Sequence, residues 1–335
     1  GAFGERRTPV LPLSDAERTL YGEQFGTYFR NATVTPDFPR AAELMAARWE
    51  EEVGGVELDG VMSIDVVGMS YVLEGVGPVP VPQATLTSEN LVELLLSTAY
   101  EVLPEDAQDT YFNGAARAIF AAAKGQVVSS SRLVQGFDRA AQEGRFRFVP
   151  FVPSEREALT GSPLLGALSG DAGATPHVDI DLNDATGSKM SYYLRSETMV
   201  AATGCRDRRQ TLAGRLELSQ TLPQTVAAEL PDYVTGAGKY GTEPGSQLVL
   251  VRLHAPFGGG LSNLRVDRRS VDDVAQVVVL DGRPAVTLNV LVTGPGPAVV
   301  EWEMQTGAGQ DRGTRVATTP GIAAHSTRAV VTSAC

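Results

Sequence analysis

The chain has 335 residues, of which 43% are hydrophobic and 20% charged, and its formal net charge is −12 at pH 7. An acidic field of this size argues against nucleic acid as the main partner, because neutralising phosphates requires a basic surface. No run of about 18 apolar residues occurs, so no segment of the chain is expected to cross a membrane. A chain of this length is typical of about two domains.

Helical periodicity runs through much of the first half of the chain. The first clear helix is expected from Asp37 to Trp49. Its apolar stripe is predicted to consist of Ala42, Met45, Trp49 and Val53. Further helices are expected over residues 66–74, 88–100, 109–124 and 131–143, with strands over 59–65 and 145–151.

The pattern changes to short alternating runs in the second half. Residues 177–184 alternate between apolar and polar, and a turn leads into residues 189–194, which predicts a hairpin. After residue 196 helical periodicity disappears, and β-branched runs follow at the spacing of a sandwich. These runs are residues 247–253, 274–280, 284–292 and 298–304. The sequence therefore predicts an α/β domain over residues 1–195 and an all-β, immunoglobulin-like sandwich over residues 196–335.

The chain has only two cysteines, Cys205 and Cys335. They are either free thiols in a reducing compartment or one disulfide in an oxidising one. We favour the disulfide, because an unpaired cysteine at an exposed chain end is reactive. Three scattered histidines and no Cys-x-x-Cys pair argue against a zinc site, and no metal is expected.

Two stretches match ligand-binding motifs only formally. Residues 236–241 fit the dinucleotide fingerprint, but no helix is expected after them, so a loop is predicted. Asp179, Asp181 and Asn183 resemble the start of a calcium loop. However, Asp184 stands where an EF-hand needs glycine, and the apolar residues between the acids favour a strand. A cation held by these acids in another geometry stays open as a weaker alternative.

The entrance of the first helix has a rigid sequence that allows two interpretations. Asp37 is placed to cap the helix, and Pro39 is tolerated in the first turn. In the functional interpretation, Arg30 and Arg40 join this helix N-terminus in a small rim that attracts anions. The structural cap is the preferred interpretation.

An ordered series of motifs resembles a known family. The series includes "PVLPLSDAERTLYG", "TPDFPRAAELMAARW", "LDGVMSIDVVGMSYVLEGVGPV", "LTSENLVELLL" and "GSQLVLVRLHAPFGG". It resembles an actinobacterial envelope family known only as domain of unknown function four-thousand-twelve. This resemblance implies a protein outside the cytoplasm, held by an N-terminal membrane helix. It also implies that this chain begins after an upstream segment of its first domain.

The family is more distantly similar to the LytR–CpsA–Psr proteins, which transfer glycopolymers from polyprenyl pyrophosphate to the cell wall. Those enzymes use an arginine cluster and an upstream acid. Here the corresponding helix offers Arg117 and Lys124 but no arginine pair. These two cations would neutralise phosphate if the protein is catalytic, while the simpler interpretation of Arg117 is a solvated helix face. The catalytic residues stay unknown.

Two functions are expected from the sequence. In the first, an extracytoplasmic envelope protein binds polyprenyl-phosphate-linked glycans and, in the catalytic case, transfers them. Arg30, Asp37, Arg40, Arg117 and Lys124 would then bind the ligand. In the second, a non-catalytic scaffold or adhesion module contacts other envelope proteins through the sandwich. No cofactor is expected, with Mg²⁺ required only in the catalytic case.

Overall fold

A computed structural model describes residues 3–55, 57–125, 127–322 and 328–335. The chain forms two compact units. The helical unit spans residues 58–166, and the sheet unit combines residues 3–57 with residues 167–335. The predicted boundary after residue 195 therefore falls inside strand β6 (Leu194–Arg206), and the first helices group with the sheets.

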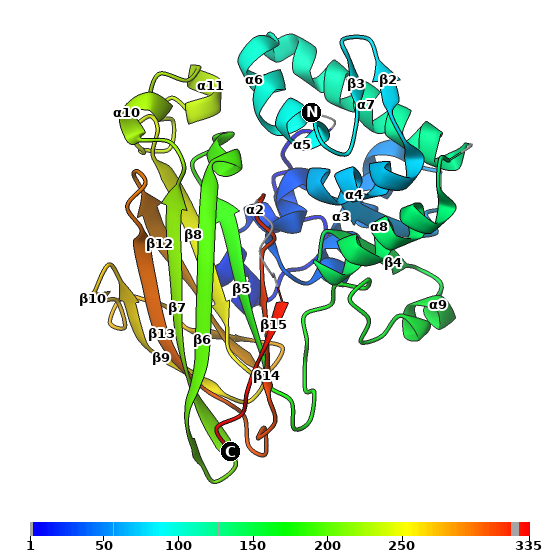
Figure 1. The fold of residues 1–335 in the computed structure, drawn as a ribbon. Coiled ribbons are helices and arrows are strands. Elements are labelled where there is room, and N and C mark those ends of the chain that lie inside the picture. The colour runs from blue at the N-terminus through cyan, green and yellow to red at the C-terminus, as the bar shows by residue number, and fades with distance from the viewer. Residues whose placement is uncertain (1–2, 56, 126, 323–327) are drawn as a thin grey trace. The chain divides into compact units, whose positions relative to one another are not determined.

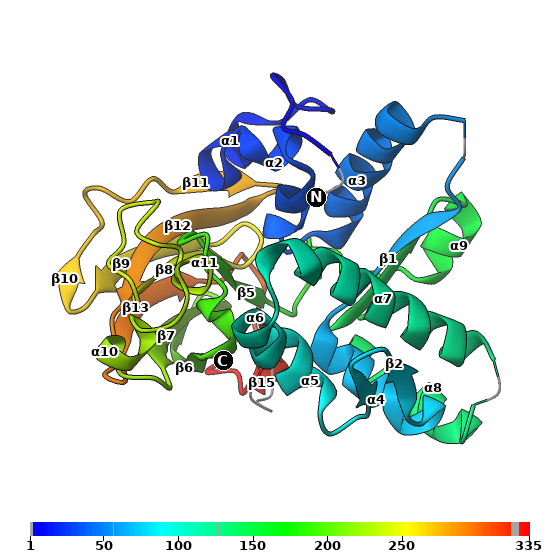
Figure 2. The same cartoon turned by 90° about the horizontal axis from the view of Figure 1, so that it is seen from above.

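The helical unit contains helices with only short strands (Figure 2). Its helical elements are α4 (Val66–Val76), α5 (Leu91–Glu93), the π-helical turn η2 (Leu94–Thr98), α6 (Ala99–Val102), α7 (Glu105–Lys124), α8 (Ser130–Gln142) and α9 (Pro153–Ala158). Its strands are β1 (Gly60–Ile64), β2 (Val79–Val81), β3 (Ala84–Leu86) and β4 (Phe146–Pro150). β1 pairs with β4 and β2 with β3, both antiparallel.

Helices α4 and α8 approach each other closely because glycines lie at their crossing. A Cβ atom at Gly75 would lie 2.2 Å from the backbone nitrogen of Leu133. A Cβ atom at Gly136 would lie 2.4 Å from the carbonyl oxygen of Tyr71. Apolar side chains of α4, β2, β3 and α7 form the adjoining core, with Leu73, Leu86 and Ile119 among its buried members.

The sheet unit begins with helices and continues with two sheets. Its helical elements are α1 (Asp15–Tyr21), α2 (Gln24–Thr27), the 3-10 helix η1 (Phe29–Val34), α3 (Phe38–Val53), the 3-10 helix η3 (Met190–Tyr192), α10 (Gln224–Ala227) and α11 (Asp232–Thr235). Its strands are β5 (His177–Asp184), β6 (Leu194–Arg206), β7 (Arg209–Gln220), β8 (Gln247–His254), β9 (Gly260–Val266), β10 (Arg269–Ser270), β11 (Val278–Leu280), β12 (Arg283–Val292), β13 (Ala298–Gln305), β14 (Thr314–Thr318) and β15 (Arg328–Val331).

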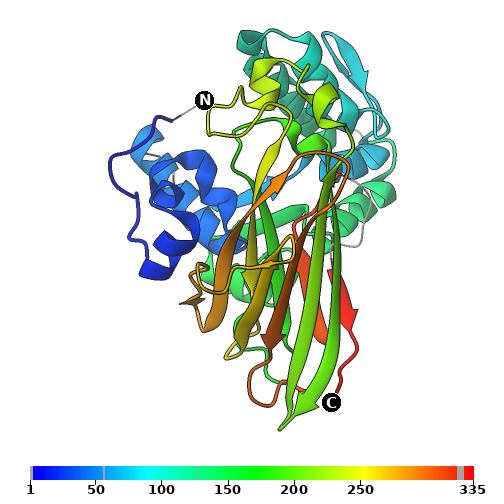
Figure 3. The same cartoon turned by 90° about the vertical axis from the view of Figure 1, so that its left-hand side faces the viewer.

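The strands form two sheets that face each other across one core (Figures 1 and 3). The five-stranded sheet has the order β10-β9-β13-β7-β6, and the six-stranded sheet has the order β11-β12-β8-β5-β14-β15. Alternate residues of each strand point inward, so that Leu216 and Trp302 of one sheet share a core with Val251 and Leu288 of the other. The predicted mixture of helices and strands, with a C-terminal region rich in β-sheet, is thus confirmed.

The N-terminal helices cover part of the outer face of the six-stranded sheet. Leu20, Phe25 and Leu44 join Leu280 and Ala285 in a second apolar cluster of the sheet unit. These helices are therefore stabilised by apolar burial against β11 and β12.

The predicted hairpin at residues 177–194 is wrong. β5 pairs with β8 in antiparallel orientation and with β14 in parallel orientation, while β6 joins the other sheet. The turn between them is held by Asp184, whose carboxylate accepts hydrogen bonds from the backbone N–H groups of Thr186 and Ser188. The chain then passes through η3 and crosses to the other sheet instead of folding back on β5.

The predicted stripe of α3 is only partly correct. Ala42 is buried, but Trp49 is 39% exposed and Val53 is 49% exposed. The buried face instead includes Leu44 and Arg48, and Arg48 donates a hydrogen bond to the carbonyl oxygen of Gly4. The buried face of α3 is therefore close to the predicted one, but it includes Arg48.

Candidate functional site

A groove opens between the free edges of the two sheets in the sheet unit. It is lined by residues 196–202 of β6, by residues 329–332 at β15, and by Val316, Thr318, Thr319 and Gly321, and it encloses about 660 Å³. We call it the edge groove. Among the residues that the structure describes, β6 ends the five-stranded sheet and β15 ends the six-stranded sheet, so each strand has one hydrogen-bonded neighbour within its sheet. A volume of this size lies within the range of ligand-binding pockets.

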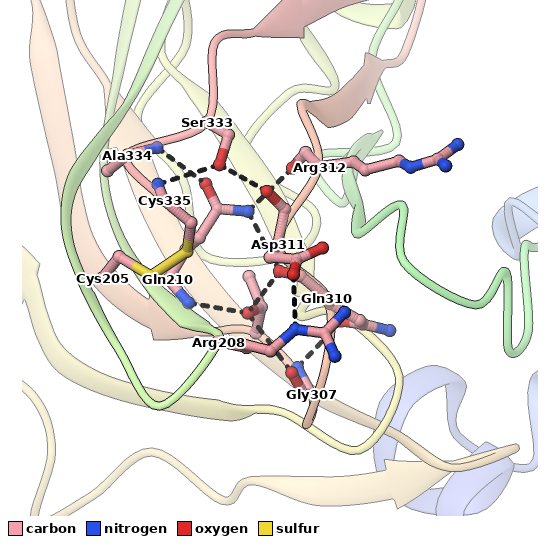
Figure 4. The surroundings of a disulfide bond; sticks show 11 residues. Cys205, Arg208, Gln210, Gly307, Gln310, Asp311, Arg312, Ser333, Ala334 and Cys335 are labelled. Carbon is pink, nitrogen blue, oxygen red and sulfur yellow. Dashed lines mark hydrogen bonds and ion pairs between the residues drawn. A yellow bond between two sulfur atoms is a disulfide. The ribbon is translucent and has the colours of Figure 1, made fainter.

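The predicted disulfide between Cys205 and Cys335 is confirmed (Figure 4). It joins the two chain segments that line the edge groove. Their Cα atoms lie 5.1 Å apart, and both residues are exposed. Residues 202 and 332 line the groove, and each chain segment reaches its cysteine three residues later. β6 and β15 are therefore linked covalently at one end of the groove.

Hydrogen bonds hold the C-terminal residues beside this disulfide (Figure 4). The backbone N–H of Ala334 donates to Oε1 of Gln210 over 3.1 Å, and the hydroxyl of Ser333 donates to the carbonyl oxygen of Asp311 over 2.6 Å. The side-chain amide of Gln210 also donates to the carbonyl oxygens of Gln310 and Arg312. The end of the groove is thus tied to the β7 and β14 regions by more than the disulfide.

The outer face of the five-stranded sheet is charged next to the groove. Arg215 of β7 pairs with Glu217 and Glu301, each over 2.8 Å. Glu197 of β6 lies directly opposite Glu217 in the strand register and has no ion-pair partner among the described residues. The edge strand therefore carries an uncompensated negative charge beside another carboxylate.

The structure gives Asp37 a different task from the predicted cap. Asp37 occupies the N-cap position of α3, yet its side chain makes no capping hydrogen bond. Its Oδ1 instead accepts a hydrogen bond from the backbone N–H of Leu168 over 2.9 Å. Burial raises the pKa of this carboxyl, although the hydrogen bond from the N–H of Leu168 acts in the opposite direction. Asp37 thus connects the start of α3 to the segment that leads into β5.

The two arginines of the predicted rim differ in their surroundings. Arg40 donates to Glu17 over 2.7 Å and to the carbonyl oxygen of Pro12 over 2.7 Å, and it also contacts Glu43. Arg30 is exposed on η1. Arg40 is therefore committed to local acids, which weakens the interpretation as an anion-attracting rim.

Arg117 and Lys124 lie two turns apart on α7, and both are exposed. The Nζ atom of Lys124 lies 5.4 Å from the ring centroid of Phe120. The buried face of this helix is formed by other residues, including Ala115 and Ile119. The structure thus places both cations on the solvated side of the helix, where the simpler interpretation of Arg117 put it.

Sequence reasoning missed a pair of arginines in the helical unit. Arg145 donates to Glu143 over 2.7 Å and to Asp65 over 2.9 Å. Asp65 also caps α4 by accepting from the N–H of Gly68 over 2.6 Å. Arg139 pairs with the same Glu143 over 2.9 Å. The spacing of four residues between Arg139 and Glu143 at the end of α8 could have predicted that pair, whereas Asp65 lies 80 positions from Arg145. Both arginines are neutralised by these carboxylates.

The acids of the apparent calcium motif belong to strand β5, as the alternation predicted. Asp179 pairs with Arg283 over 2.6 Å, Asn183 accepts a hydrogen bond from Arg252, and Asp181 lies 3.2 Å from Nε2 of the fully buried His254. Within the described parts of the chain, no group of three or more acidic, histidine or cysteine side chains is arranged to hold a metal ion.

Arg252 of β8 and Arg283 of β12 connect neighbouring segments of the chain to the six-stranded sheet. Arg252 donates to the carbonyl oxygen of Leu20 over 2.9 Å and stacks on Tyr21. Arg283 donates to four backbone carbonyl oxygens besides Asp179. Burial lowers the pKa of Arg252 and raises that of Tyr21. Arg252 and Arg283 are therefore structural residues that connect other segments of the sheet unit to the six-stranded sheet.

Residues 1–100 match the family described as Protein of unknown function (DUF4012). Over that part of the chain, the match agrees with the family that the sequence motifs indicate. No curated protein and no solved structure matches the chain. In the residues that the structure describes, every helix is too short or too polar to cross a bilayer.

Proposed function

We propose that this protein is a non-catalytic scaffold or adhesion module of the cell envelope, which contacts other proteins through its β-sandwich. The observation that carries the proposal is the edge groove, where two free strand edges flank an open space of about 660 Å³. An open strand edge is a common docking element for protein partners, because its unpaired backbone groups can form a further ladder of hydrogen bonds.

The disulfide supports the extracytoplasmic part of the proposal. Disulfides persist in oxidising compartments and are rare where thiols are kept reduced. Cys205 and Cys335 form a disulfide although both are exposed and so open to reduction. The resemblance to an actinobacterial envelope family supports anchoring by a membrane helix upstream of the described chain. We also propose that the α/β part has a LytR–CpsA–Psr-like fold and that the β-sandwich is immunoglobulin-like.

Binding or transfer of polyprenyl-linked glycans is the rival function that the resemblance implies. A pyrophosphate site needs a cluster of cations aimed at the ligand. In this chain Arg139 and Arg145 are paired with carboxylates, and Arg117 and Lys124 lie on an exposed helix face. The charge arrangement therefore favours the scaffold.

Photo-crosslinking in cells that export the protein separates these functions. A photoreactive amino acid replaces Met199, which is 49% exposed on the rim of the groove, in the full membrane-anchored protein. The matched control replaces Val279, which is 63% exposed on edge strand β11 at the far side of the other sheet. We expect protein adducts from position 199 and few from position 279.

Two results would contradict the proposal. One is an adduct at position 199 that contains lipid or glycan but no protein. The other is alkylation of both cysteines in intact cells without a reductant, because it would place the chain in a reducing compartment.

A further inference from the structure

The residues that line the edge groove are consecutive on β6. A pocket over the face of a strand touches every second residue, because successive side chains point to opposite faces. Here all seven residues from 196 to 202 take part, and so do all four from 329 to 332. The groove is therefore bordered by the strand edges themselves, with their backbone N–H and C=O groups.

We infer that the edge groove takes an extended peptide, which adds to β6 as a further strand of the five-stranded sheet. This inference rests on the proposed function and specifies the partner. β6 is the better edge for such pairing because it has 13 residues, whereas β15 has 4. A hydrocarbon chain would leave the backbone groups of both edges without partners, whereas a peptide backbone supplies donors and acceptors at strand spacing.

The groove interior specifies one face of the peptide. Val200 and Ala202 of β6 lie against the shared core, as do Val316 of β14 and Val331 of β15. Thr198 has the same parity along β6 as Val200 and Ala202. A strand seated here would therefore turn every second side chain toward a narrow apolar wall, which favours small or β-branched apolar residues at those positions.

The outer face of the five-stranded sheet favours a positive charge on the added peptide. Glu197 has no ion-pair partner among the described residues, and its cross-strand neighbour Glu217 shares Arg215 with Glu301. A residue added opposite Glu197 on the other side of β6 is favoured when it is lysine or arginine. The formal net charge of −12 acts in the same direction. The partner is thus an extended segment that alternates apolar residues with basic ones.

Selection from a random library of linear peptides, displayed against the disulfide-intact chain, tests this inference. We expect the enriched peptides to alternate apolar and basic residues, and to slow amide hydrogen exchange in residues 196–202. The tightest peptide is then synthesised with N-methyl groups on alternate amides. Methylation of the amides that face β6 should weaken binding at least about tenfold, and methylation of the other set should change it little.

A charge-reversed variant tests the outer face. E197K should weaken binding of the basic peptide by up to about fivefold and favour the same peptide with glutamate in place of lysine. The matched control is E303K, which makes the same change on the outer face of the same sheet, on β13. E303K should leave both affinities within about twofold.

The inference is overturned if no peptides are enriched, or if the enriched peptides do not alternate apolar and basic residues. Equal binding of the two N-methylated forms would also overturn it. So would slowed amide hydrogen exchange in residues 196–202 that arises from self-association alone. Protection by polyprenyl phosphate vesicles and not by peptides would also overturn it. These results leave the proposed function standing if Met199 still forms protein adducts in cells, because a protein would then contact the groove without adding a strand to β6.

Discussion

Trp302 of β13 lies directly over Gly214 of β7, its register partner in the five-stranded sheet. A Cβ atom at Gly214 would lie 2.1 Å from Cε2 of the indole ring. Trp302 is only 3% exposed and belongs to the shared core of the two sheets. The absence of a side chain at Gly214 is therefore what allows the ring to pack there.

Gly214→Ala should lower the free energy of unfolding of the sheet unit by about 1–3 kcal/mol, because the ring must move within a filled core. Both tryptophans, Trp49 and Trp302, belong to the sheet unit, so urea unfolding followed by tryptophan fluorescence reports on that unit. The control is Gly204→Ala, where an added Cβ meets no heavy atom within 4 Å. Equal stabilities for the two variants would refute the packing argument.

Arg283→Met should destabilise the sheet unit by about 3–5 kcal/mol, because it leaves Asp179 and several buried carbonyl oxygens without their donor. The comparison is Arg215→Met, which removes an arginine that is 37% exposed and paired on the outer face of the other sheet. Exposed pairs contribute little to stability, so this variant should shift the urea midpoint far less than Arg283→Met does. Similar losses in the two variants would show that Arg283 is not the connecting residue described above.

Two substitutions at Asp37 test its hydrogen bond to the backbone N–H of Leu168. Asp37→Ala leaves the half-buried N–H of Leu168 without its acceptor and should cost about 1–3 kcal/mol. Asp37→Asn keeps a carbonyl oxygen for that N–H and should cost much less. The control is Asp15→Asn, which removes the charge of an exposed aspartate in the first turn of α1.

The pH dependence of the Asp37 variants has a definite sign. Burial raises the pKa of Asp37 in the folded chain above its usual value of about 3.8. The folded state therefore binds the proton more tightly, and the contribution of Asp37 to stability is lost as pH rises through the folded pKa. Relative to Asp37→Asn, the natural protein should be most stable at acid pH and lose that advantage toward neutrality. The opposite trend in urea midpoints would contradict a buried carboxylate.

Removal of both cysteines, by Cys205→Ser with Cys335→Ser, should cost about 4–5 kcal/mol in the chain-entropy account, because the disulfide joins residues 130 positions apart. Hydrogen exchange should also rise in residues 329–332, which line the groove beside the freed chain end. Reduction of the natural protein should reproduce both effects. A loss below about 1 kcal/mol, with unchanged exchange, would show that the neighbouring hydrogen bonds hold the end alone.

Local sequence patterns predicted many elements of this fold but not their partners. The alternation of residues 177–184 correctly identified β5, and the residues after it also suggested a turn. Which strand pairs with β5 depends on contacts with β8 and β14, which lie far along the chain. The same holds for the edge groove, because a strand edge is free only after every other strand has found its place.

Site residues were harder to predict for a related reason. Asp37 carries a clear capping signature, yet Leu168, far away in the chain, supplies the N–H that its carboxylate accepts. Arg48 fell outside the predicted stripe because charged residues are rarely buried unless paired. It pairs with Glu52 over 2.7 Å and also donates to the carbonyl oxygen of Gly4. The disulfide could be predicted because only one pairing of two cysteines is possible.

The structure of the disulfide-intact chain with its tightest selected peptide bound would test the central claim most directly. The account predicts that the peptide lies along residues 196–202, continues the five-stranded sheet beyond β6, and turns its apolar side chains toward Val200 and Val316. A peptide bound on another face, bound without backbone hydrogen bonds to β6, or bound while the edge groove stays empty would contradict it.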